Sequence, residues 1–161
     1  MAHVLIGGQP VHFGYGQVAM SGFFFRTQLL LYACIQALHN LGAVAIVGGG
    51  AAALLLARRS PGMQRTLVWV ITLGWVNQGV TGALFGITSY VYDGRLPDIH
   101  GIALTALFLK MACAVAGIIL GMTYLGFESG WSGAGQRRVL GVDFGLGVTA
   151  LTAAAFLRWF S

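Results

Sequence analysis

Polar side chains are rare inside the long apolar stretches of this sequence, so each one is a candidate for chemistry. A polar group in the hydrocarbon layer of a membrane costs free energy unless it pairs or lines a polar cavity. The candidates are Gln36, His39, Asn40, Asn77, Gln78, Lys110 and Asp143. His39 carries an imidazole that can ligate iron or relay a proton, and Lys110 is the only lysine of the chain.

Three of these side chains are expected at one depth in the membrane. With a rise of about 1.5 Å per residue, His39 lies about 16 Å from the expected outer edge, Asn77 about 14 Å and Lys110 about 13 Å. Three different helices therefore present polar groups near the midplane. We predict one cofactor-binding site made of His39, Lys110 and Asn77.

For His39 the sequence leaves several interpretations open. It is a core histidine bonded to Asn77 or to a backbone carbonyl, an axial ligand of haem b, a proton relay, or a ligand of another metal. The other histidines of the chain are His3, His12 and His100. His100 follows Pro97 at the expected outer edge, so its depth does not match that of His39. Lys110, Met111 or an open coordination position fits better opposite His39.

Asp143 is the acid nearest to these groups. It lies four residues into the predicted fourth span, so its vertical gap to Lys110 is about 10 Å. The expectations for Asp143 are a direct pair with Lys110, which needs a tilt or register shift, or contact with Arg138 or Arg65 at the inner surface.

The elements that position these groups follow from composition. Of 161 residues, 57% are hydrophobic and 8% are charged, with a mean hydropathy of +0.80, far from the roughly 25% charged residues of soluble domains. The predicted fold is all-α, a polytopic integral membrane four-helix bundle that forms a single domain over 1–161. The predicted spans are 29–57, 66–92, 102–126 and 139–160, each long enough to cross a bilayer. Residues 1–28 are predicted to be an external or interfacial segment.

The basic residues indicate orientation rather than a nucleic-acid surface. They are scattered between apolar segments, so no nucleic acid is expected as a partner. Five arginines fall in the two loops of one side, namely Arg58, Arg59, Arg65, Arg137 and Arg138, while the other side carries Arg26, Arg95 and Arg158. The positive-inside rule then predicts both termini outside. The expected location is the inner (cytoplasmic) membrane of a bacterium.

Small residues recur at helical spacing inside the spans. The glycine pairs are Gly82 and Gly86, Gly117 and Gly121, and Gly141 and Gly145. Such pairs let helices pack closely, either within the bundle or against other membrane subunits or a second copy. Cys34 and Cys113 are interpreted as small buried hydrophobic residues.

The first and third spans resemble the CopD-type and HemJ-type membrane families. The resemblance rests on His39 followed by Gly48, Gly49 and Gly50, and on Leu109 followed by Lys110. These helical bundles are associated with copper handling and with protoporphyrinogen oxidation by a haem-containing protein, respectively. The resemblance implies that His39 and Lys110 correspond to positions involved in haem binding and activity.

Together these features predict a membrane redox protein that binds haem b or belongs to an electron-transfer complex, with quinone as a candidate electron partner. One alternative is a non-catalytic accessory or assembly subunit of a larger membrane complex. A further alternative is transport of a metal or small solute. Whether the chain is an enzyme stays open, because no carboxylate pair, Ser-His-Asp group or phosphate loop is recognisable.

Overall fold

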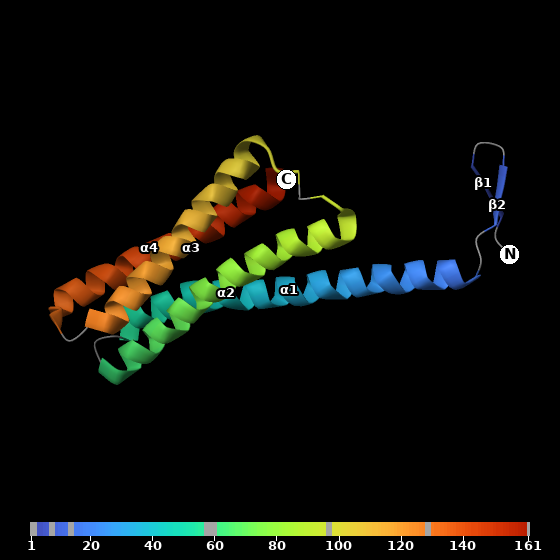
Figure 1. Ribbon diagram of the computed structural model, residues 1–161. Coiled ribbons are helices and arrows are strands. Elements are labelled where there is room, and N and C mark those ends of the chain that lie inside the picture. Colours follow the sequence, from blue (N-terminus) through green and yellow to red (C-terminus); the bar gives the residue numbers. More distant parts are fainter. Residues whose placement is uncertain are drawn as a thin grey trace. The chain divides into compact units, whose positions relative to one another are not determined.

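Within the described residues, the computed structural model contains four long helices and a small N-terminal hairpin (Figure 1). The structure describes residues 3–6, 9–12, 15–56, 61–95, 98–127 and 130–160. Strands β1 (His3–Ile6) and β2 (Gln9–His12) pair in antiparallel register. The helices are α1 (Tyr15–Leu56), α2 (Pro61–Asp93), α3 (Gly101–Phe127) and α4 (Gly133–Phe160).

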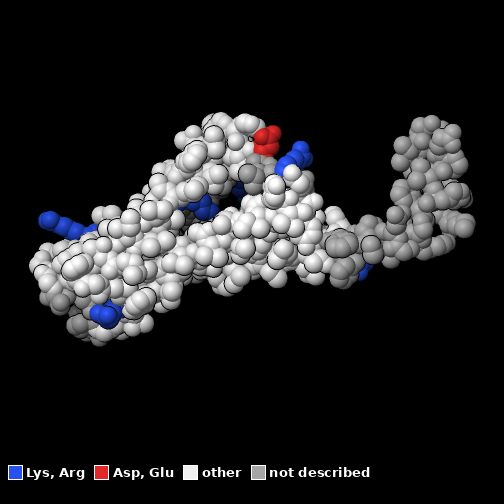
Figure 2. Space-filling view, viewed as in Figure 1, with Lys and Arg blue, Asp and Glu red and all other residues white. Residues whose placement is uncertain are grey.

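Each helix contains a stretch that is long and apolar enough to cross a bilayer. These stretches are Phe25–Leu56, Gly62–Tyr92, Gly101–Phe127 and Gly133–Phe160. Figure 2 shows few charged side chains over the visible face of the bundle. The prediction of an integral membrane, all-α four-helix bundle is thereby confirmed, and its apolar outer faces contact lipid. The short hairpin is an addition that the sequence did not lead us to expect.

The helices begin earlier than predicted. Residues 15–28, expected as an external segment, belong to α1. Helix α4 begins at Gly133 instead of residue 139 because the Ser132 hydroxyl accepts a hydrogen bond from the Gly135 amide at 3.2 Å and caps the first turn. Helix α2 begins at Pro61, a residue suited to the first helical position. The predicted loop residues Arg58, Arg59 and Pro97 lie outside the described residues.

The chain divides into two compact units, Met1–Cys34 and Ile35–Ser161. The first unit contains the hairpin and the beginning of α1. The second contains the rest of α1 together with α2, α3 and α4, and α3 and α4 lie side by side in it. The core and the candidate site described below belong to the second unit.

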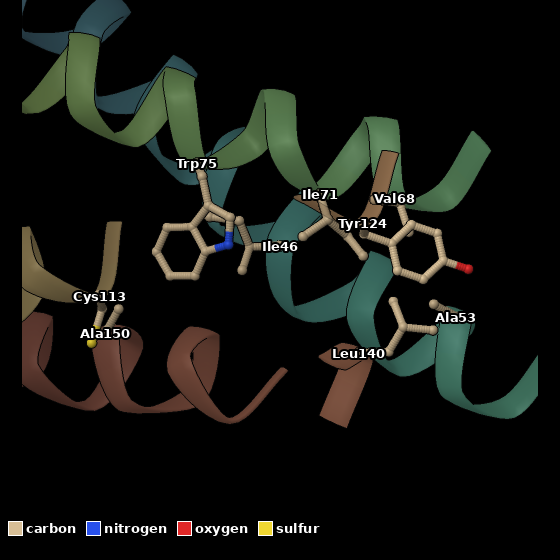
Figure 3. Packing of buried hydrophobic residues seen from close by; sticks show 9 residues of the cluster. All are labelled: Ile46, Ala53, Val68, Ile71, Trp75, Cys113, Tyr124, Leu140 and Ala150. Atoms are coloured by element: carbon tan, nitrogen blue, oxygen red, sulfur yellow. The ribbon is translucent and has the colours of Figure 1, made fainter. Parts of the chain in front are cut away.

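The core of the second unit is built around Trp75, which is 1% exposed. Figure 3 shows its ring pointing from α2 toward the other helices, with Ile46 of α1 beside it. Further along, Ile71, Tyr124 and Leu140 belong to the same buried cluster. The four helices thus share one apolar core.

Glycines set the closest helix contacts, and here one of the predicted pairs is confirmed. A methyl group added to Gly117 would come within 3 Å of the Trp75 ring, and one added to Gly121 would meet Thr72. Helix α3 therefore packs against α2 through both glycines. By contrast, a methyl group at Gly82, Gly86, Gly141 or Gly145 would meet nothing within 4 Å. The sequence left two alternatives for these four glycines, and their open surroundings do not support close packing within the bundle. Packing against another subunit or a second copy stays a prediction.

The two cysteines differ in their surroundings. Cys113 is buried in the core, as predicted, whereas Cys34 is exposed on α1. The prediction for Cys34 is wrong because its face of the helix points outward.

Candidate functional site

His39 and Lys110 meet in the middle of the bundle. The end at which α1 stops and α2 starts also carries Arg137 and Arg138, and we call it the basic end. His39 and Lys110 each lie about 25 Å along their helices from this end. The Lys110 Nζ atom is 2.7 Å from His39 Nε2. The structure thus brings together the two predicted site residues at the common depth that the sequence indicated.

Hydrogen bonds assign the tautomer of His39. The Thr81 hydroxyl donates its single proton to the Asn77 carbonyl oxygen. In this network the contact of 2.6 Å between Thr81 Oγ1 and His39 Nδ1 has the ring nitrogen as donor. His39 Nε2 is left with a lone pair, and Lys110 donates to it. This neutral imidazole is the form of histidine that ligates metals.

Amide side chains of α2 attach this helix to α1 beside His39. Asn77 Nδ2 donates to the Leu38 carbonyl oxygen at 2.7 Å, and Gln78 Nε2 donates to that of His39. The approach depends on Gly42, because a methyl group there would clash with both amide nitrogens. Asn77 therefore lies at the predicted site, but it holds the backbone next to His39 and does not contact the imidazole.

The surroundings of the pair are partly apolar. The Phe85 ring lies edge-on to His39, with ring centroids 5.8 Å apart and an interplanar angle of 76°. His39 and Lys110 are both half-buried. Figure 2 shows the bundle hollowed between the α1–α2 pair and the α3–α4 pair, with basic side-chain atoms at the edge of the hollow.

Asp143 has a partner that the sequence analysis missed. The Trp75 indole Nε1 donates to Asp143 Oδ1 at 3.0 Å, and Asp143 is 4% exposed. The predicted pairing with Lys110 is wrong because Lys110 points at His39. Helix α4 starts at Gly133, so Asp143 lies about 15 Å into the helix, and its vertical gap to Lys110 is the expected one of about 10 Å.

The remaining candidates lie elsewhere. His100 pairs with Asp98 at 3.1 Å on the surface at the opposite end of the bundle. Met111 is 54% exposed, which removes it as a residue opposite His39. Gln36 donates to Asn40 at 2.8 Å on an exposed face of α1. The side chains of His3 and His12 lie outside the described residues.

The donor set fits one axial ligand of a haem. His39 Nε2 offers a lone pair, and Nδ1 is held by Thr81 in the manner of the outer partners that orient ligating histidines. Two nitrogens on opposite sides of an iron would stand about 4 Å apart, at roughly 2 Å per bond. The 2.7 Å contact is too short for this, so Lys110 is a neighbour of the coordinating nitrogen and not a second axial ligand in this arrangement.

A metal site built from protein donors alone finds no support in the described part of the chain. No three histidine, cysteine, aspartate or glutamate side chains gather there in a way that could hold an ion.

Sequence reasoning missed Thr81, Phe85 and Trp75. Thr81 and Phe85 follow Asn77 at intervals of four residues, so they share a helical face with it. That spacing was the available signal for both. For the pairing of Trp75 with Asp143 the sequence holds no comparable signal, since it depends on the register between α2 and α4.

Comparisons of the chain with protein-family models, with curated proteins and with solved structures find no match.

Proposed function

We propose that this chain is a membrane redox protein that binds haem b through His39. The observation that carries the proposal is the neutral, anchored imidazole in the middle of the bundle, with its Nε2 lone pair directed at Lys110. A bound haem would supply one-electron chemistry. The resemblance of His39 and Lys110 to the HemJ-type pattern supports the same assignment.

The chain's own residues have distinct roles in this proposal. Thr81 holds the Nδ1–H bond and so fixes the orientation of the ring. Without a ligand, Lys110 donates a hydrogen bond to the Nε2 lone pair. When haem binds to His39, the Lys110 ammonium group would remain beside the site. A positive charge near a redox centre favours the reduced form. Asn77 and Gln78 fix the helix backbone that carries His39.

The absorption spectrum of the protein purified from its native membrane tests this proposal. A Soret band is expected in the wild type and in His100→Ala, because His100 lies on the surface, 10 residues before Lys110 in the sequence, and pairs with Asp98 there. The band should be lost or strongly shifted in His39→Ala. A colourless wild-type protein, or an unchanged band in His39→Ala, would refute haem ligation by His39.

A second candidate function, an accessory subunit of a membrane complex, has its own observation. The Gln36–Asn40 pair is exposed on the outer face of a transmembrane helix, where polar groups facing lipid are costly. Gly82, Gly86, Gly141 and Gly145 also lie on open outward faces. Both features suit contact with another membrane subunit or a second copy. Native mass spectrometry in mild detergent would detect such a partner, and a bare monomer would count against this function.

The setting that we propose is the inner membrane of a bacterium, with both termini outside. Arg65, Arg137 and Arg138 lie at the basic end, which the positive-inside rule assigns to the cytoplasm. Quinone in the bilayer is the proposed electron partner, because the half-buried site lies at membrane depth.

A further inference from the structure

A second polar site surrounds Asp143. It lies between the basic end and the level of His39 and Lys110. Among the described residues of the four membrane spans, Asp143 is the acidic side chain that faces the interior. It lies about 10 Å closer to the basic end than Lys110 does.

Among the described residues, the side chains that contact Asp143 or line its cavity carry no positive charge. From α2, the neutral indole of Trp75 donates one hydrogen bond. From α3, the titratable side chain of Tyr124 lines the same cavity as Asp143. From α1, Gly50 packs against the neighbouring Phe144. The one lysine of the chain is already engaged with His39.

A cavity of about 10 Å³ adjoins Asp143, which is room for about one water molecule. Its other walls are apolar side chains, including Val68, Ile71 and Leu140. Asp143 is the acidic side chain that lines this cavity, so a water there would find a hydrogen-bond partner in its carboxyl group. No lysine or arginine is among the side chains that line the cavity, so a negative charge on Asp143 is unfavourable in this apolar position.

We propose that Asp143 is a proton-binding site of the bundle, served by one water in the adjoining cavity and approached from the basic end. The ligand is a proton, since a cavity for one water leaves no room for the larger coordination shell of a metal ion. Trp75 holds the carboxyl in place from the other side. The proposal rests on Asp143 and its neighbours and does not depend on haem binding.

A hydrophobic carbodiimide tests this proposal in the full-length protein in liposomes. The reagent dissolves in the bilayer and reacts with a carboxylic acid that carries its proton. The acid adds across one C=N bond, the proton goes to nitrogen, and an acyl shift gives a stable N-acylurea without loss of any atom. Cleavage after Arg138 and Arg158 yields a peptide whose one acidic residue is Asp143, so mass spectrometry assigns the adduct directly.

We expect the adduct of one carbodiimide on this peptide in the wild type, with a yield that falls as the pH is raised. Asp143→Asn keeps an oxygen that accepts from Trp75 and should lose the adduct. Trp75→Phe removes the hydrogen bond that favours the carboxylate and should speed the labelling. Exposed Asp98 serves as the control for a water-soluble carbodiimide. An unmodified Asp143 peptide in folded wild-type protein, together with an infrared spectrum that lacks a protonated-carboxyl band abolished by Asp143→Asn, would overturn the proposal.

Discussion

Replacing Gly117 by alanine tests how α2 and α3 pack, and Gly82→Ala is its matched control. At Gly117 the added methyl group would come within 3 Å of three atoms of the buried Trp75 ring, which cannot swing away. At Gly82 it would meet nothing within 4 Å. Both changes gain the same helix propensity, about 1 kcal/mol, so the difference between the two variants isolates the cost of overpacking.

That cost is about 1–3 kcal/mol for a methyl group forced into a well-packed core. For a chain of this size the corresponding difference in melting temperature is about 2–12 °C. Thermal unfolding in mild detergent, followed by circular dichroism, measures it. Gly117→Ala should melt below the wild type or close to it, and Gly82→Ala at or above it. Equal melting temperatures for the two variants would refute the packing of Gly117 against Trp75.

Three further predictions concern the site and the topology. Lys110→Met keeps the side-chain length and removes the charge. A unit charge roughly 6 Å from the iron contributes about 3 kcal/mol, so the midpoint potential of the haem-loaded protein should fall by on the order of 100 mV in a redox titration. An unchanged potential would place Lys110 outside the site. Thr81→Val removes the partner of His39 Nδ1 and should lower haem affinity about 10–100-fold in an absorbance titration, whereas Thr105→Val, on an exposed face of α3, should not. The proposed orientation can be tested with single cysteines in a background without Cys34 and Cys113. Arg95→Cys should react with an impermeant maleimide added to intact cells, and Gly62→Cys should not. The reverse pattern would invert the proposed orientation.

The membrane fold and the meeting of His39 with Lys110 could be predicted because both depend on one-dimensional quantities. Apolar length determines which segments span the bilayer. Counting residues from the ends gives depth along each helix, and matched depth was enough to group His39, Lys110 and Asn77. The start of α4 was misjudged because a polar turn capped by Ser132 adds two helical turns before the apolar run.

The rotation of each helix about its own axis was not predictable in the same way. Small residues four apart mark a close-packing face, but the pattern does not say whether that face meets the bundle or its surroundings. Gly117 and Gly121 face Trp75 and Thr72, whereas Gly82 and Gly86 face outward. For the same reason the partner of Asp143 could not be identified, since Trp75 reaches it only in the observed register of α2 and α4.

Nitrogen NMR on the haem-free protein in lipid bilayers tests the contact between His39 and Lys110 most directly. Lys110 is the only lysine, so lysine labelled at Nζ gives a single side-chain signal without assignment. The 2.7 Å contact predicts magnetisation transfer between this nitrogen and a histidine ring nitrogen. The transfer should disappear in His39→Gln and persist in His100→Gln. No transfer in the wild type, or transfer that survives in His39→Gln, would contradict a shared site of these two residues.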